Sequence, residues 1–133
     1  MKARGAVVAL FAFLAAAQPA AAALEVRLST DPTRPRAGQA SSILLRPYVP
    51  YVREDGSCCR LEPADVDYPF RLEAVSPTGR VFSLRVRRTS DPFLWSGRFV
   101  FRAAGRWEVR ATNWGPRYST SAGGRPRIFV RVR

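Results

Sequence analysis

This chain of 133 residues contains no histidine, and its only methionine and only lysine are Met1 and Lys2. Imidazole is the usual proton shuttle near neutral pH and the commonest metal ligand, and a thioether suits Cu(I). Histidine-dependent hydrolysis and metal sites built from His or Met are therefore excluded from the rest of the chain. Without His or Lys, the Ser, Thr, Asp and Glu side chains form no recognisable pair of nucleophile and base. We expect no catalytic residue, no enzyme activity and no cofactor.

Long apolar runs are also lacking. The stretch Ala6 to Ala17 has 12 apolar residues, against the ~20 that a membrane-spanning helix needs. Basic residues precede this stretch, and Gln18-Pro19 ends it just ahead of an alanine run. The pattern is typical of a secretory signal peptide, residues 1–23, cleaved after Ala23. An uncleaved N-terminal anchor is the alternative. We expect a secreted or periplasmic protein with no membrane span after removal of the signal peptide.

Negative charge is scarce after residue 23. Removing 23 of the 133 residues leaves 110, which suits a single domain. This part carries 20 Arg against 10 Asp and Glu, a formal charge of +10. Such a charge attracts anionic surfaces in a manner that salt screens. The alternative is that the arginines only keep the outward faces of strands soluble.

From Leu24 onward the apolar residues alternate with period two, and no stripe of period 3.6 follows. The short strands and their spacing predict an all-β fold, a single immunoglobulin-like antiparallel β-sandwich that spans residues 24–133. The pattern predicts seven strands, at about 24–30, 39–48, 70–74, 80–88, 95–102, 106–113 and 127–133.

Several details of this sandwich are also predicted. Pro47 and Pro50 are expected to end the second strand, and residues 47–67 to form a long loop. The Ala104-Gly105 connection is short enough for a tight turn, so strand 106–113 is expected to pair with strand 95–102. Trp107 is the expected anchor of the core.

Cys58 and Cys59 are the only cysteines, and they are adjacent. Neighbouring Cα atoms across a trans peptide lie ~3.8 Å apart, below the usual 4.4 to 6.8 Å of a disulfide. A vicinal disulfide would therefore be strained and easily reduced. Three interpretations stay open: a disulfide within the pair or between molecules, free thiols without a role, and a redox or soft-metal site. Two thiolates alone do not complete a metal site, so no metal ligand is assigned.

Five of the ten acids lie between Glu54 and Asp67. Ca²⁺ takes six to eight oxygen ligands, but the spacing of these acids matches no calcium loop that we can specify. Charge balance with neighbouring arginines is the interpretation we favour.

Eight arginines occupy positions that alternate with inward apolar residues: Arg85, Arg87, Arg98, Arg102, Arg106, Arg110, Arg127 and Arg131. Guanidinium groups that share one face can hold phosphate or carboxylate groups by two hydrogen bonds each. Arg85, Arg87, Arg98 and Arg102 are the candidate anion-binding residues. Exposed aromatics for base stacking are few, so sequence-specific nucleic-acid recognition is not expected.

The stretch from Phe93 to Phe101, followed by the stretch from Ala104 to Arg110, resembles the late strands of small secreted bacterial immunoglobulin-like domains of the YtkA-like and FixH-like type. Asp31 to Gly38 is similar to their first connection between strands. The resemblance implies an immunoglobulin-like fold and an extracytoplasmic location. Relatives in the wider CopC-like group bind copper through His and Met, which this chain lacks after residue 1, so no copper site carries over.

Two functions from different classes follow. The first is a non-enzymatic extracytoplasmic binding module whose partner is an envelope protein or an anionic polymer. The second is a thiol-based redox or soft-metal protein centred on Cys58 and Cys59. The first predicts binding that salt weakens, whereas the second predicts a dithiol that can be titrated.

Overall fold

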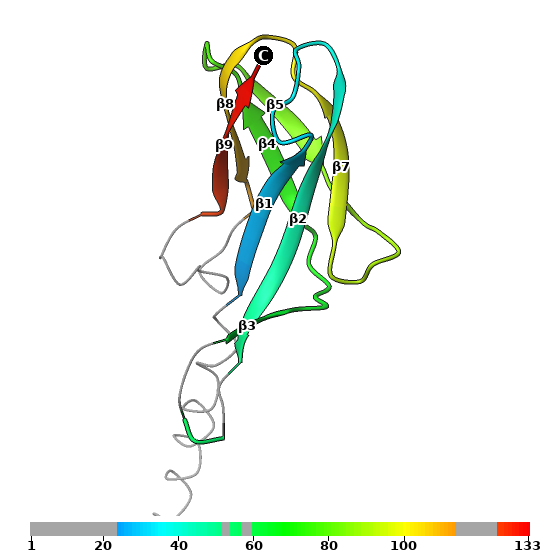
Figure 1. Cartoon of the computed structure of the whole chain (residues 1–133), viewed down its shortest axis with the longest axis vertical. Helices are drawn as coiled ribbons and strands as arrows, with labels where there is room; N and C mark the ends of the chain where they lie inside the picture. Colours follow the sequence, from blue (N-terminus) through cyan, green and yellow to red (C-terminus); the bar gives the residue numbers. More distant parts are fainter. Residues whose placement is uncertain (1–23, 52–53, 57–59, 114–124) are drawn as a thin grey trace, which may run out of the picture.

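The computed structural model describes residues 24–51, 54–56, 60–113 and 125–133, which form two antiparallel sheets packed face to face (Figure 1). The first sheet has the order β1-β2-β7-β6, with β3 paired to β2, and the second has the order β5-β4-β8-β9. The nine strands are β1 (Glu25–Asp31), β2 (Ala40–Tyr51), β3 (Arg60–Pro63), β4 (Arg71–Val75), β5 (Val81–Arg85), β6 (Arg87–Arg88), β7 (Trp95–Val100), β8 (Gly105–Ala111) and β9 (Arg127–Val132).

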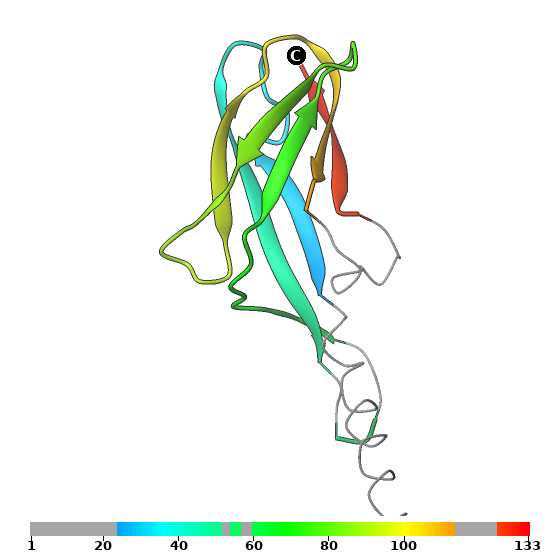
Figure 2. The same ribbon diagram turned by 180° about the vertical axis from the view of Figure 1, so that it is seen from behind.

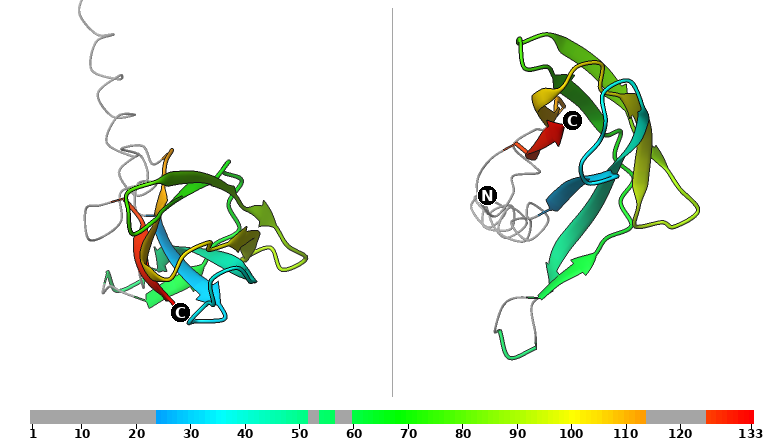
Figure 3. Two further views of the ribbon diagram at one scale, coloured as in Figure 1. Left: turned by 90° about the horizontal axis from the view of Figure 1, so that it is seen from above. Right: turned by 45° about the horizontal axis from the view of Figure 1, so that its top comes forward.

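The all-β sandwich that the sequence predicts is therefore confirmed. Its strand order follows the ABED and C′CFG sheets of immunoglobulin-like folds, with β1, β2, β7 and β6 as the first sheet and β5, β4, β8 and β9 as the second. Figure 2 shows the molecule from behind, with the second sheet in front, and Figure 3 shows both sheets from above and from a tilted direction.

The alternating pattern produces the core because successive side chains of a strand point to opposite faces. In β1 and β2 the inward positions include Val26, Leu28, Ile43 and Leu45, all of them buried. Trp107 of β8 is 1% exposed and donates its indole N–H to the carbonyl oxygen of Ala103 at 2.9 Å. Its ring lies within 6 Å of three phenylalanine rings, those of Phe82, Phe99 and Phe101. The expected anchor role of Trp107 is confirmed.

The predicted strand 80–88 is in fact two strands in different sheets. β5 pairs with β4 in the second sheet, whereas Arg87 and Arg88 pair with β7 in the first. Val86 is 6% exposed and lies where the chain crosses from one sheet to the other. The alternation of Phe82, Leu84 and Val86 continues through the crossing, so the pattern did not reveal it.

The expected pairing of 95–102 with 106–113 is wrong. β7 pairs with β2 and β6, while β8 pairs with β4 and β9 in the other sheet. The connection between β7 and β8 crosses from the first sheet to the second, and its first residue, Phe101, is buried. Gly105 has a φ of +125°, and a Cβ there would lie 2.8 Å from the ring of Pro77. This crossing is a connection between sheets and not a hairpin.

The expected long loop 47–67 and the expected end of the second strand at the prolines are also wrong. β2 continues to Tyr51 and pairs with β3, so that part of this segment is a hairpin at one end of the sandwich (Figure 1). The pairing of β2 with β7 reaches only as far as Leu45 of β2. Beyond it, on the same side of β2, the carbonyl oxygen of Pro47 accepts a hydrogen bond from the N–H of Ala64 at 3.0 Å.

Neither proline removes a hydrogen bond between β2 and β1. N–H and C=O of one residue in an antiparallel strand point to the same side, so the nitrogen of Pro47 also faces away from β1. Pro50 faces the other side, but it lies beyond Tyr48, the last residue of β2 that pairs with β1. Proline is therefore tolerated within this strand at both positions.

Residues 1–23, which carry the expected signal peptide, lie outside the described residues. Among the residues that the structure does describe, no helix is long and apolar enough to cross a membrane.

Candidate anion-binding surface

The four candidate anion-binding residues do not share one face. Arg85 lies on the outer side of the second sheet, at the end of β5, whereas Arg87 and Arg98 lie on the outer side of the first sheet. Arg98 and Arg102 are brought together, because both line a shallow depression with Phe82, Ser83, Phe99 and Val100 at the edge between β5 and β7. All four arginines are exposed.

One end of the sandwich, which we call the basic end, gathers three connections and the last residue of the chain. Ala37 donates to the carbonyl oxygen of Arg133 at 2.8 Å, and Arg133 donates to that of Pro35 at 2.9 Å. Gly38 donates to the carbonyl oxygen of Phe101 at 2.8 Å, which joins the connection between β1 and β2 to that between β7 and β8. The connection between β4 and β5 adjoins them, as the proximity of Gly105 to Pro77 shows.

The charged side chains of these segments are all basic. Residues 32–39, 76–80, 101–105 and 133 contain no Asp or Glu. Their exposed arginines are Arg34, Arg36, Arg80, Arg102 and Arg133. The acid next to them in the sequence is Asp31, the last residue of β1.

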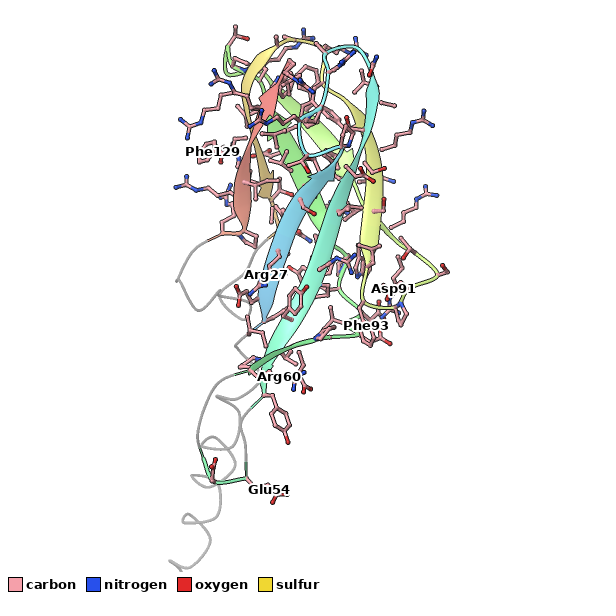
Figure 4. The ribbon with its side chains drawn as sticks, in the orientation of Figure 1. Arg27, Glu54, Arg60, Asp91, Phe93 and Phe129 are labelled. Atoms are coloured by element: carbon pink, nitrogen blue, oxygen red, sulfur yellow. The ribbon has the colours of Figure 1, made fainter. Side chains whose placement is uncertain are left out.

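The opposite end of the sandwich carries much of the negative charge. Glu54 lies at the far end of the structure from residue 133 in Figure 4, which has the orientation of Figure 1. Glu62 lies on β3, and Asp65 and Asp67 follow that strand. Asp65 forms an ion pair with Arg88, which supports charge balance as the role of that acid. The acidic side chains are therefore concentrated toward the end of the long axis that lies opposite the basic end.

The outer side of the second sheet is continuous with the basic end and also carries many arginines. Its register places arginine directly opposite arginine at three points: Arg71 with Arg85, Arg106 with Arg131, and Arg110 with Arg127. Like charges at directly opposed positions destabilise a sheet, because the Cβ atoms of such pairs lie only ~5 Å apart. A negatively charged group that contacts this row of basic pairs would therefore stabilise it, whether it belongs to the protein or to a ligand.

Among the residues that the structure describes, Arg110 is the one of these arginines that receives negative charge from a neighbouring side chain. It forms a short hydrogen-bonded ion pair with Glu73, and its Nη1 lies 3.6 Å from a carboxylate oxygen of Glu108. The hydrogen bond to Glu73 raises the pKa of the Arg110 guanidinium above its ordinary value. In the part of the chain that the structure describes, Arg106, Arg127 and Arg131 have no carboxylate within ion-pair distance.

Phe129 lies between the two basic pairs of β8 and β9, directly opposite Glu108, and points away from the sandwich (Figure 4). Its side chain is 49% exposed. The guanidinium carbon of Arg106 lies 4.0 Å from the centre of its ring, and that of Arg127 lies 5.6 Å from it. We call this surface, made of Arg106, Glu108, Arg110, Arg127, Phe129 and Arg131, the arginine face.

Sequence reasoning placed these arginines outward, but it did not single out the arginine face. The alternation of β8 and β9 indicates which side chains point out, whereas the pairing of Arg106 with Arg131 depends on the register of two strands separated by a long connection. Arg125 was also missed. It lines a shallow depression beside the face together with Glu108, Arg110 and Arg127.

The described residues give no geometry for the other candidate sites, the cysteine pair and a metal site. Cys58 and Cys59 lie outside the described residues, so the three interpretations of this pair stay open. Among the described residues, no three His, Cys, Asp or Glu side chains gather in a way that could hold a metal ion.

No protein-family model matches the chain, and no curated protein shows significant similarity to it.

Proposed function

We propose that the protein is a non-enzymatic, extracytoplasmic immunoglobulin-like binding module that holds an anionic partner on the basic end and on the arginine face that adjoins it. The observation that carries the proposal is the separation of charge. The basic end has no acidic side chain and five exposed arginines, namely Arg34, Arg36, Arg80, Arg102 and Arg133. A positive field of this kind raises the rate of encounter with negatively charged partners.

The sandwich supports this role because the arginines stand on rigid elements. The connections at the basic end are held to one another by backbone hydrogen bonds that involve Ala37, Gly38 and Arg133. Guanidinium groups stay protonated at every physiological pH and bind phosphate, sulfate or carboxylate groups through two parallel hydrogen bonds. A partner can therefore be held without conformational change in the domain.

The location and the YtkA-like resemblance belong to the same proposal. The apolar stretch 6–17 and the alanine run that follows it support export, and the similarity of residues 93–107 to secreted bacterial domains supports an extracytoplasmic address.

The test is the salt dependence of binding to dextran sulfate. We expect the logarithm of affinity to fall linearly with the logarithm of salt concentration between about 50 and 500 mM, as in other associations that release counterions. A variant with Arg34→Gln, Arg36→Gln and Arg102→Gln should show weaker binding and a shallower slope. Absence of binding at about 50 mM salt, or an affinity that salt leaves unchanged, would contradict the proposal.

A further inference from the structure

We propose that the arginine face binds a linear polymer that carries phosphate or sulfate groups, which lies along β8 and β9. The inference rests on the proposed function and names the class of ligand and the residues that hold it. Arg106 and Arg131 hold one group of the polymer, and Arg127 with the neighbouring Arg125 holds another.

The first site consists of two arginines that have no acidic partner among the described residues. Arg106 and Arg131 are directly opposed on neighbouring strands and both are exposed, and no carboxylate of the described chain lies within ion-pair distance of either. Like charges at directly opposed positions repel each other, and an anion between them relieves that repulsion. A tetrahedral oxyanion has enough oxygens to accept hydrogen bonds from both groups.

Phe129 holds the guanidinium groups of Arg106 and Arg127 in place without neutralising their charge. The Arg106 guanidinium lies over the ring at 4.0 Å, and the Arg127 guanidinium lies 5.6 Å from the ring centre. A cation over an aromatic face keeps its charge, and the N–H groups at the edge of a stacked guanidinium stay free to donate. The exposed ring is therefore a support for arginine, which also leaves less of it available to stack on a nucleic-acid base.

The second site lies four residues along the strands. Arg110 is opposite Arg127, and Arg125 lines the adjoining depression with them. At ~3.3 Å per residue the two arginine pairs are roughly 13 Å apart. A single small anion cannot occupy both sites, whereas a chain with regularly spaced charges can.

Glu108 gives the face its selectivity for a narrow ligand. It lies between the two arginine pairs, opposite Phe129, and its carboxylate is 3.6 Å from Nη1 of Arg110. A broad acidic protein surface that covers the whole face would place negative charge against this carboxylate. A thin chain can pass over Phe129 and contact only the arginines, which favours a polymer over an acidic protein.

The experiment titrates the purified protein with long-chain inorganic polyphosphate, dextran sulfate and inorganic orthophosphate, and follows binding by calorimetry. We expect both polymers to bind, with orthophosphate about a hundredfold weaker per phosphate group, because a linked second group binds at high effective concentration. The ratio of the polyphosphate and dextran sulfate affinities distinguishes phosphate from sulfate as the preferred group. Polyglutamate that binds as tightly as either polymer would overturn the preference for tetrahedral groups.

Two variants test the location. The double variant Arg106→Gln with Arg131→Gln should weaken polymer binding by about tenfold or more, because each substitution removes a charge-assisted hydrogen bond to the polymer. The matched control is Arg27→Gln with Arg46→Gln. This is also a directly opposed pair, but its members contact Glu25 at 3.7 Å and Asp91 at 3.9 Å. Equal losses in the two double variants would overturn the inference and leave the proposed function standing, whereas no polymer binding by the parent protein would overturn both.

A variant that changes no charge completes the test. Phe129→Ala should weaken polymer binding about two- to fivefold, because it removes the cation–π support of Arg106 and Arg127. Val81→Ala is the control, since Val81 is 52% exposed on the opposite edge strand of the same sheet. Unchanged affinity in Phe129→Ala would show that net charge alone holds the polymer, which contradicts the inference.

Discussion

The carbonyl oxygen of Arg85 lies 2.2 Å from the point that a Cβ on residue 97 would occupy, so Gly97 lets the chain cross from one sheet to the other. The crossing carries β5 of the second sheet directly into β6 of the first. A side chain at residue 97 would press against the backbone of this connection and against Val86, whose methyl group would be 3.2 Å away.

Gly97→Ala is therefore predicted to lower the free energy of unfolding by about 1 to 3 kcal/mol, the usual cost of overpacking a core. Chemical denaturation followed by tryptophan fluorescence measures it. Ser96→Ala is the matched control, because its side chain lies on the outer side of β7. A denaturation midpoint for Gly97→Ala equal to that of Ser96→Ala would show that the crossing has room for a methyl group.

Trp107→Ala is predicted to cost about 3 to 5 kcal/mol of unfolding free energy, as truncations of buried aromatics do. The ring is 1% exposed and packs on Phe82, Phe99 and Phe101. Trp107→Phe should cost less, because it keeps most of the packing and loses the hydrogen bond to Ala103. Unfolding experiments in urea decide the order, and an unchanged midpoint for Trp107→Ala would refute the anchor role.

Asn113 joins the segment before β4 to the end of β8. Its Nδ2 donates to the carbonyl oxygen of Pro69 at 2.5 Å, and its Oδ1 accepts from the N–H of Arg71 at 3.0 Å. Asn113→Ala should destabilise the protein by about 1 to 3 kcal/mol, since two hydrogen bonds are lost. Asn113→Asp keeps the acceptor and loses the donor. Its second carboxylate oxygen would face the carbonyl oxygen of Pro69 and repel it, so its thermal midpoint should also lie well below that of the parent, and a midpoint equal to the parent's would contradict the role of this hydrogen bond.

Polymer binding should depend on salt and hardly at all on pH between about 6 and 9. The chain has no histidine and its basic side chains after residue 23 are all arginine, so no basic side chain loses its proton in this range. Titrating dextran sulfate, whose sulfate groups do not change charge there, isolates the protein's contribution. A transition in affinity near neutral pH would require another ionising group in the site.

Intact mass spectrometry of the protein from its native compartment tests the address and the cysteines together. The expected chain begins at Leu24, after cleavage at Ala23. Reduction that adds about 2 Da to a monomer would establish a disulfide between Cys58 and Cys59 and favour the redox interpretation. Two free thiols would remove that interpretation, and a mass that includes residues 1–23 would contradict cleavage.

The sequence predicted the strands better than their partners. Period-two alternation located β1, β4 and β9, with inward residues such as Val26, Leu72 and Val130, because burial of one face imposes that period. It did not reveal which sheet each strand joins. Val86 is buried between the sheets and in phase with β5, so the pattern is continuous across a change of sheet.

The same limit applies to the candidate site. Outward arginines could be recognised individually, but the opposition of Arg106 and Arg131 depends on how β8 and β9 pair across residues 112–126. Arg85 and Arg87 are two residues apart and lie in different sheets. A search by sequence proximity therefore grouped arginines that the fold separates, and it missed the group that the fold assembles.

The central claim, that the arginine face is the place where an anionic polymer binds, is tested most directly by NMR during a titration with polyphosphate. The account predicts that shifts concentrate on the side-chain Nε–Hε signals of Arg106, Arg127 and Arg131 and on the amides of β8 and β9. The amides of β1, around the ion-paired Arg27, should stay unchanged. Shifts of similar size on both sheets, or a maximum on β1 and β2, would contradict the account.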